Sequence, residues 1–337
     1  MVVRIVRKVG DDLRSLVVLV VVLAVTYPIA YSLSPTVGIA FGYAATWAIA
    51  ALGFNLLFGY TGLLSFGHAL FLGVGAYAAG FVFKYLGVLS LEVFLVVSIL
   101  ASLLVAIVIG PVVVRYTRIF FAILMLAIAQ VFWSLYYKFY WITGGTDGIK
   151  LPRPSLFGVA LENLDFTTYH HIYYYFVLGL LALLAYLMWR IVNSPFGLAL
   201  RVVRDNEERA KFIGISVTRM RLYSFLISAV YSGITGALVA VHGRLVTPDI
   251  AYWLTSGKLV FLTLLGGTRV FIGPIIGSYA YHLIETVAMK FIYWQLVMGA
   301  LIVAIVILLP GGLMQLVTKS VEVFYAKRKV SIKQVAR

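Results

Sequence analysis

The sequence contains no cysteine and little charge: only 12% of its 337 residues are Asp, Glu, Lys or Arg. Without cysteine, the chain forms neither disulfides nor thiolate metal sites. A soluble domain carries about twice this charged fraction. In contrast, 63% of the residues are hydrophobic, and long apolar runs recur along the whole chain. The composition therefore indicates a polytopic membrane protein and excludes a soluble enzyme held by one anchor.

Motifs of nucleotide and metal chemistry are also missing. The phosphate loop G-x-x-x-x-G-K-[ST] does not occur, because Leu259 follows Gly257 and Lys258, and Tyr252 stands where the first glycine should be. There is no H-E-x-x-H motif, and no Ser-His-Asp set is evident. We therefore expect no catalytic centre, no metal site and no cofactor bound by this chain. The net charge of +15 does not indicate a nucleic-acid partner, because the basic residues lie in short segments between apolar spans.

Ten segments are apolar enough to cross a membrane, which requires about 20 residues each. Residues 1–337 are thus expected to form one all-α transmembrane domain. The basic start and the apolar run from Leu16 resemble a signal peptide, but no small-residue cleavage site follows, so we interpret it as an uncleaved first span. The eighth segment is short and is either broken or partial. The expected spans are 13–33, 36–58, 63–85, 91–114, 119–141, 170–192, 222–245, 254–268, 271–290 and 294–314.

The basic residues predict the orientation. An even number of spans places both termini on one side, which then holds 20 of the 27 lysines and arginines. By the positive-inside rule this side is cytoplasmic. The inner loop 193–221 would lie in the cytoplasm, and the loop 142–169 outside the cell.

The stretch from Asn55 to Tyr77, NLLFGYTGLLSFGHALFLGVGAY, combines apolar residues with helix-weakening and polar ones. Polar side chains at membrane depth usually face a bundle interior or a water-filled path, so Asn55, Ser65 and His68 are candidates for a translocation pathway. For His68 the alternative is a hydrogen-bonded packing histidine. Glycines allow close helix packing or a break in a helix. The glycines predicted to pack or to act as hinges are Gly59, Gly62, Gly67, Gly73 and Gly75.

Two polar residues lie three apart in the ninth span, His282 and Glu285, on one face of the expected helix. They form either a proton relay, which would suggest a secondary transporter, or a structural pair, which we favour. Gln130 in the fifth span is a weaker indication of the same kind.

The inner loop contains RVVRDNEERAKFIGI, a pattern of helix, break and helix. Asp205 and Glu208 have the spacing of a capping box, and Gly214 suits the left-handed position that ends a helix. Ala210, Phe212 and Ile213 are expected to be available for contact. A charged helix this short is marginal alone in water. It is either a solvated loop or an element that docks on a cytoplasmic partner.

These segments together resemble the permeases of branched-chain amino-acid ABC transporters, the LivH/LivM family. The resemblance rests on GFNLLFGYTGLLSFGHALFLGVGAYAA (53–79), TGGTDGI (143–149), the run 200–240, LTLLGGTRVFIGPIIGSYAYH (262–282) and LLPGGLMQLV (308–317). The SFGH and TGGTDG elements are more similar to the LivM branch. Two departures are Glu208 to Lys211, where smaller residues are usual, and Arg269, where a glycine is usual.

The resemblance implies a type II importer fold, as in the vitamin B12 importers, in a prokaryotic cell membrane. It implies a second, LivH-like permease subunit, two cytoplasmic ABC ATPases that bind ATP and Mg²⁺, and an extracytoplasmic substrate-binding protein. Residues matching the family's coupling helix are Arg204, Asp205, Asn206, Glu207, Glu208 and Gly214. Alternatives are a permease of the same family for urea or short amides, a proton-coupled transporter, and a purely structural membrane subunit.

Overall fold

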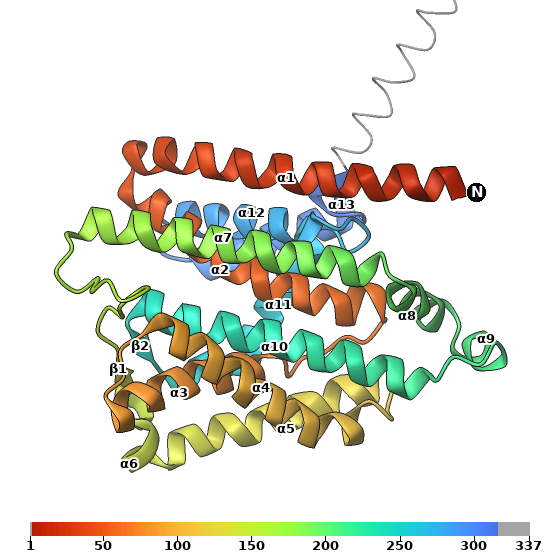
Figure 1. Cartoon of the computed structure of the whole chain (residues 1–337), viewed down its shortest axis with the longest axis horizontal. Helices are drawn as coiled ribbons and strands as arrows, with labels where there is room; N and C mark the ends of the chain where they lie inside the picture. The colour runs from red at the N-terminus through yellow and green to blue at the C-terminus, as the bar shows by residue number, and fades with distance from the viewer. Residues whose placement is uncertain (1, 316–337) are drawn as a thin grey trace, which may run out of the picture.

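The computed structural model describes residues 2–315, which form a bundle of helices with one very short sheet (Figure 1). The basic residues expected between Lys319 and Arg337 lie outside the described residues. The helices of the first half are α1 (Val2–Leu33), α2 (Pro35–Asn55), α3 (Ala69–Leu86), α4 (Leu91–Val113), α5 (Arg118–Lys138) and α6 (Tyr140–Thr143). Those of the second half are α7 (Phe166–Val192), α8 (Pro195–Asp205), α9 (Glu207–Phe212), α10 (Val217–Gly243), α11 (Trp253–Gly266), α12 (Gly273–Ala288) and α13 (Trp294–Leu308).

Three short turns of other helix types and two strands complete the fold. They are the π-helix η1 (Leu56–Tyr60), the 3₁₀ helices η2 (Gly145–Asp147) and η3 (Pro248–Ala251), and the strands β1 (Ile149–Lys150) and β2 (Leu245–Val246). The strands pair antiparallel, with Ile149 opposite Val246, and tie the loop after α6 to the end of α10.

Seven described helices are long and apolar enough to cross a membrane: α1 from Leu13, α2 with η1, α3, α4, α5, α7 and α10. Two shorter apolar helices, α11 and α13, follow. Each of the ten expected spans overlaps a helix, but the third begins six residues later than expected, because residues 61–68 are not helical apart from short turns. The chain is a multi-pass, predominantly helical membrane protein.

The side chains of helix α4 are distributed as expected for a helix that packs on one side and faces lipid on the other. Its small side chains recur every four residues and are buried against α3 and α10, whereas its large ones face outward. The buried row is Ser98, Ser102, Ala106 and Gly110, and the exposed row is Leu100, Leu104, Val108 and Val112. In lipid, small residues let helix backbones approach, and large apolar side chains can face the acyl chains at no cost. In a helix of a soluble protein the large apolar side chains face the core. The reverse arrangement, with small residues buried and large apolar ones outside, is typical of a membrane helix.

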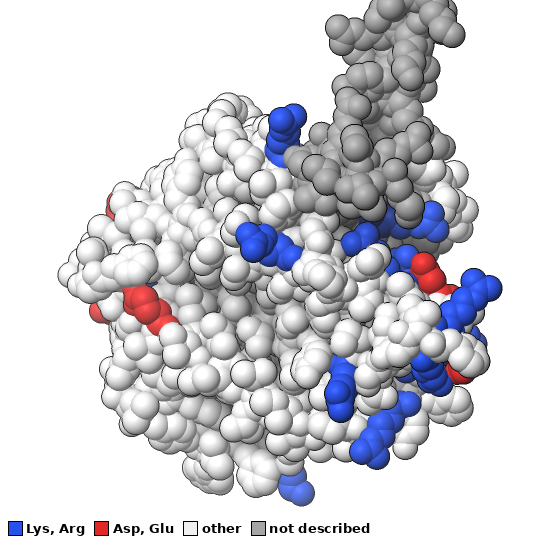
Figure 2. Space-filling view, turned by 45° about the vertical axis from the view of Figure 1, so that its right-hand side comes forward, with Lys and Arg blue, Asp and Glu red and all other residues white. Residues whose placement is uncertain are grey.

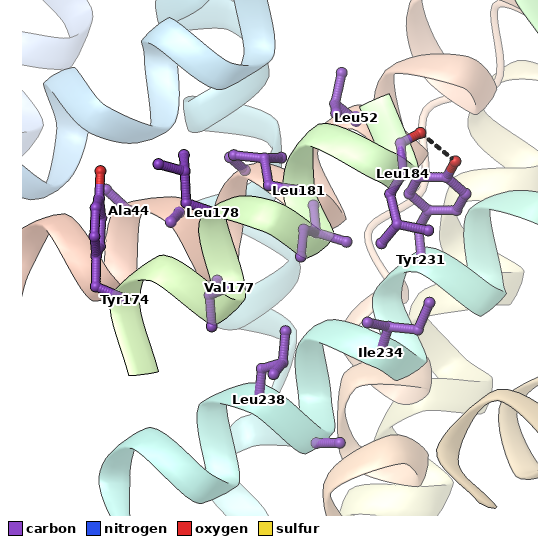
Figure 3. Packing of buried hydrophobic residues seen from close by; sticks show 14 of the residues in the cluster. Ala44, Leu52, Tyr174, Val177, Leu178, Leu181, Leu184, Tyr231, Ile234 and Leu238 are labelled. Atoms are coloured by element: carbon purple, nitrogen blue, oxygen red, sulfur yellow. Dashed lines mark hydrogen bonds between the residues drawn. The ribbon is translucent and has the colours of Figure 1, made fainter. Parts of the chain in front are cut away.

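The centre of the bundle is α2, in which every residue from Ala44 to Asn55 is buried. It packs against α7, α10 and α12. Figure 3 shows leucines of α7 together with Leu52 of α2 and Leu238 of α10. The Tyr231 hydroxyl of α10 donates to the carbonyl of Leu184 at 2.8 Å. Because α2 is rich in alanine and glycine, three helices reach its backbone closely.

Capping residues and glycines determine where several helices begin or end. Asp165 caps α7 by accepting hydrogen bonds from the backbone amides of Thr168 and Thr167, at 3.2 and 3.0 Å. Hydrogen bonding from Thr168 is the main reason that the pKa of the Asp165 carboxyl lies below its usual range. Gly87, with φ of 66°, ends α3 in the left-handed conformation that glycine adopts most easily.

The bundle has two distinct ends (Figure 1). The "coupling end" carries α8, α9 and the start of α1, and the "sheet end" carries β1, β2 and α6. In Figure 2, lysines and arginines gather toward the coupling end, and the surface between the ends is largely uncharged.

Candidate functional site

The glycine-rich stretch forms a break between two membrane helices. At its start α2 widens into η1, and the chain then runs through turns from Thr61 to His68 before α3 begins. The freed backbone groups are satisfied locally: Gly62 N–H donates to Phe58 O at 3.1 Å, and the Thr61 hydroxyl donates to Leu56 O at 2.9 Å. π-Helical turns of this kind are frequent at functional sites.

A buried polar cluster holds this break in place. His68 Nε2 lies 2.7 Å from Ser228 Oγ on α10, and His68 Nδ1 lies 3.3 Å from Ser65 Oγ. The Ser256 hydroxyl of α11 accepts from the backbone N–H of Ala69 at 2.8 Å. His68 and Ser65 are fully buried, and the imidazole packs edge-on against Phe54 and other rings. Within this chain His68 therefore has the geometry of the packing alternative, and its pathway role stays a prediction.

Asn55 lies at the last turn of α2 and is 2% exposed. Its side-chain Oδ1 has no hydrogen-bond partner among the described residues. The same atom occupies the space that a Cβ on Gly59 would need. A buried amide oxygen without a partner is costly, which suits a residue whose partner arrives from outside the chain.

The predicted glycines lie where helix backbones meet. A Cβ on Gly67 would collide with the Met125 carbonyl of α5, and one on Gly75 with the Gly233 carbonyl of α10. A Cβ on Gly73 would collide with the Ala251 side chain of η3. These close approaches fit the packing role, which is one of the two roles predicted for these glycines. Gly62, with φ of 81°, turns the chain and lies against the Arg204 side chain.

The inner loop forms two helices, and one detail of its prediction is wrong. Asp205 is the last residue of α8, and the cap of α9 is Asn206, whose Oδ1 accepts from the Arg209 N–H at 2.9 Å. Asn206 is the residue with extended backbone, φ −161° and ψ 109°, so its side chain rather than that of Asp205 reaches the first turn. Glu208 instead pairs with Lys211 at 2.7 Å. Gly214 has φ of 82°, as predicted for a residue that ends a helix.

The outer surface of α9 is apolar at its end. Phe212 is 88% exposed and Ile213 is 68% exposed. Ala210, also expected to be available, is fully buried against Val203 of α8 and Val217 of α10. Of the three residues predicted to be available for contact on α9, only Phe212 and Ile213, at its tip, are therefore exposed.

Of the two helices of the inner loop, α8 contacts the break directly and α9 contacts α10. Arg204 of α8 donates through Nη1 to the carbonyl of Gly59 in η1, and its Nη2 pairs with Asp205 at 3.1 Å. Glu207 of α9 pairs with Arg221 of α10. A cleft of about 490 Å³ lies between these groups and residues 61–63. Arg204 thus links α8 to the break by a charged hydrogen bond.

The ninth span holds a different pair from the expected one. Glu285 of α12 pairs with Lys258 of α11 at 3.2 Å, and His282 Nδ1 bonds the Ser278 carbonyl at 2.8 Å. No His282–Glu285 hydrogen bond is found among the described residues. The predicted His282–Glu285 pair is therefore not formed among these residues, neither as a proton relay nor as a structural pair, and Glu285 pairs with Lys258 instead.

Comparison with known proteins identifies the family. The sequence model described as "Branched-chain amino acid transport system / permease component" matches residues 37–309. The chain belongs to this family. The match includes the break, the inner loop and the Lys258–Glu285 pair, and α1 lies before it.

Curated relatives of this permease agree with the family. LivM, the high-affinity branched-chain amino acid transport permease of Salmonella typhimurium, is 28% identical over 192 residues, 51% of this chain and 45% of that protein. LivM of Escherichia coli gives the same identity and coverage. LsrC, an autoinducer 2 import permease of Klebsiella pneumoniae, is 26% identical over 186 residues, 52% of this chain and 49% of that protein. The chain spans about half the length of the curated relatives it matches, and no solved structure gives a significant match.

Proposed function

We propose that this permease is the transmembrane subunit of an ATP-driven importer of branched-chain or other hydrophobic amino acids. It forms the translocation pathway with a second, LivH-like permease subunit. Two cytoplasmic ABC ATPases bind ATP and Mg²⁺, and an extracytoplasmic binding protein delivers the substrate. The family match and the LivM relatives support this assignment.

The proposed topology has ten spans, with both termini and the inner loop 193–221 in the cytoplasm and the loop 142–169 outside. The start of α1 and the helices α8 and α9 lie at the same end of the bundle (Figure 1), and lysines and arginines gather there (Figure 2). Both observations support this orientation under the positive-inside rule. A type II importer arrangement of the spans belongs to the same proposal.

The observation that carries the proposal is the contact between the inner loop and the break. The tip of α9 presents Phe212 and Ile213 to a partner, and α8 bonds the Gly59 carbonyl through Arg204. A stroke from an ATPase on α9 would therefore reach the segment that holds Ser65 and His68. Asn55, with its free Oδ1, is the proposed pathway residue closest to Gly59.

The test is reconstitution of the permease with its second permease, the ATPases and the binding protein. ATP-dependent uptake of leucine, valine or isoleucine is the expected result. Uptake of urea or short amides alone would assign the substrate to the alternative branch. Uptake by this chain alone, driven by a pH gradient and insensitive to ATP, would refute the proposal.

A further inference from the structure

A charged pair lies within the bundle, toward the sheet end. Lys258 Nζ is 3.2 Å from Glu285 Oε2 and 3.4 Å from its Oε1. The same ammonium group lies 4.9 Å from the ring centroids of Trp47 and of Tyr281, within range of cation–π attraction. Lys258 is five residues into α11, about 7 Å from its start at about 1.5 Å per residue. Three helices, α2, α11 and α12, thus converge on one ammonium group.

Neither side chain of the ion pair is completely buried by this chain. The side chain of Lys258 is 22% exposed and that of Glu285 is 16% exposed. Charged groups within membrane spans face a bundle interior or a water-filled cavity, because contact with lipid is costly. In the proposed importer this exposed side would therefore face protein or water rather than lipid, as in a pathway between two permease subunits.

Unpaired imidazole nitrogens lie beside the pair. His282 is 4% exposed and His242 is 8% exposed, yet Nε2 of His282 and both ring nitrogens of His242 lack hydrogen-bond partners among the described residues. The His282 ring centroid lies 6.3 Å from that of Trp47, the ring beneath the Lys258 ammonium. Buried polar atoms normally have hydrogen-bond partners. The unpaired imidazole nitrogens near the ion pair are therefore available to bind a polar substrate.

We propose that Lys258 and Glu285 form a recognition subsite for the two charged groups of a zwitterionic amino acid as it passes through the permease. The inference rests on the proposed importer function and deepens it. The α-carboxylate of the substrate replaces Glu285 beside Lys258, and the α-ammonium pairs with Glu285. Both buried charges then keep a partner throughout the exchange. A neutral solute would separate the two ions without replacing either, so the subsite selects for zwitterions.

The experiment uses the complete transporter in proteoliposomes, with saturating leucine-loaded binding protein. The variants are Lys258→Gln with Glu285→Gln, which removes both charges and leaves neither unpaired, and Lys258→Glu with Glu285→Lys, which keeps an ion pair in reverse. Lys290→Gln, an exposed lysine two residues beyond the end of α12, is the control.

We expect both double variants to assemble and to take up leucine at least tenfold more slowly than the wild type, whereas the control matches it. A structural pair would behave differently: both double variants, which leave no charge unpaired, would take up leucine at the wild-type rate. That result would overturn the subsite. If the neutral variant does not assemble, the reversed pair decides the question. If the wild type itself imports no amino acid, the proposed function fails, and the subsite fails with it.

Discussion

Replacing Gly214 tests whether α9 transmits force from an ATPase. Gly214 has φ of 82°, its N–H donates to Lys211 O at 2.9 Å, and the Ile215 N–H donates to Ala210 O at 3.0 Å. An added Cβ would meet no atom within 4 Å. The change Gly214→Ala therefore introduces backbone strain without a steric clash.

The magnitude follows from this geometry. A left-handed conformation costs a residue with a Cβ about 1–2 kcal/mol. Loss of conformational freedom in the unfolded chain offsets about 0.4–1 kcal/mol of that. The net cost of about 1 kcal/mol lowers the ratio of formed to frayed α9 about fivefold, since RT is about 0.59 kcal/mol. Because α9 has only six residues, it is marginal without its cap and its contacts with α8 and α10, so a loss of this size is expected to matter.

Gly87 provides the matched control. It ends α3 with φ of 66°, and an added Cβ there also meets no atom within 4 Å. Gly87→Ala thus adds a similar strain far from α9. In reconstituted transporter, we expect substrate uptake per ATP hydrolysed to fall severalfold for Gly214→Ala only, with both variants present in the membrane. Equal ratios for both variants and the wild type would refute the coupling role of α9.

Three further predictions concern the cap, the topology and the break. Asn206→Ala should destabilise α9 by about 0.5–2 kcal/mol and weaken co-purification of the ATPases, whereas Asp205→Ala should change it little, because Asn206 is the cap. Thr146→Cys should react with an impermeant thiol reagent in intact cells; labelling only after permeabilisation would exclude the topology. His68→Leu should lower thermal stability by about 1–3 kcal/mol because it strands Ser228, and adding Ser228→Ala should restore part of it. Full stability but lost transport in His68→Leu would instead favour the pathway role.

The sequence predicts the membrane helices well because their signal is local. All ten expected segments overlap described helices, of which seven are long and apolar enough to cross a membrane. The four-residue alternation of small and large side chains on α4 could also have been found, since it repeats along one helix. The inner loop was predicted as two helices around a break, but Asp205 and Asn206 are both good capping residues. Which of them adopts the extended backbone depends on where α8 ends against its neighbours.

Contacts between distant segments are what the sequence does not predict. Glu285 was paired with His282 because they are three residues apart, but its partner is Lys258, 27 residues earlier on another helix. No spacing rule connects α11 with α12. In the same way, the sequence predicts that the glycines pack or act as hinges, but it does not predict that the carbonyls facing Gly67 and Gly75 belong to Met125 of α5 and Gly233 of α10.

The two candidate sites share one helix. Arg204 holds the Gly59 carbonyl just beyond the end of α2, and Trp47, eight residues before Asn55, lies beneath Lys258. Eight residues of helix correspond to about 12 Å. Because α2 is buried without interruption from Ala44 to Asn55, it cannot bend into free space along this length. The π-helical turn η1 therefore lies between the Arg204 contact of the inner loop and the part of α2 that reaches the ion pair. If the proposed coupling runs along α2, it has to pass through this one turn, so a substitution that converts η1 to a regular α-helical turn should change uptake per ATP hydrolysed.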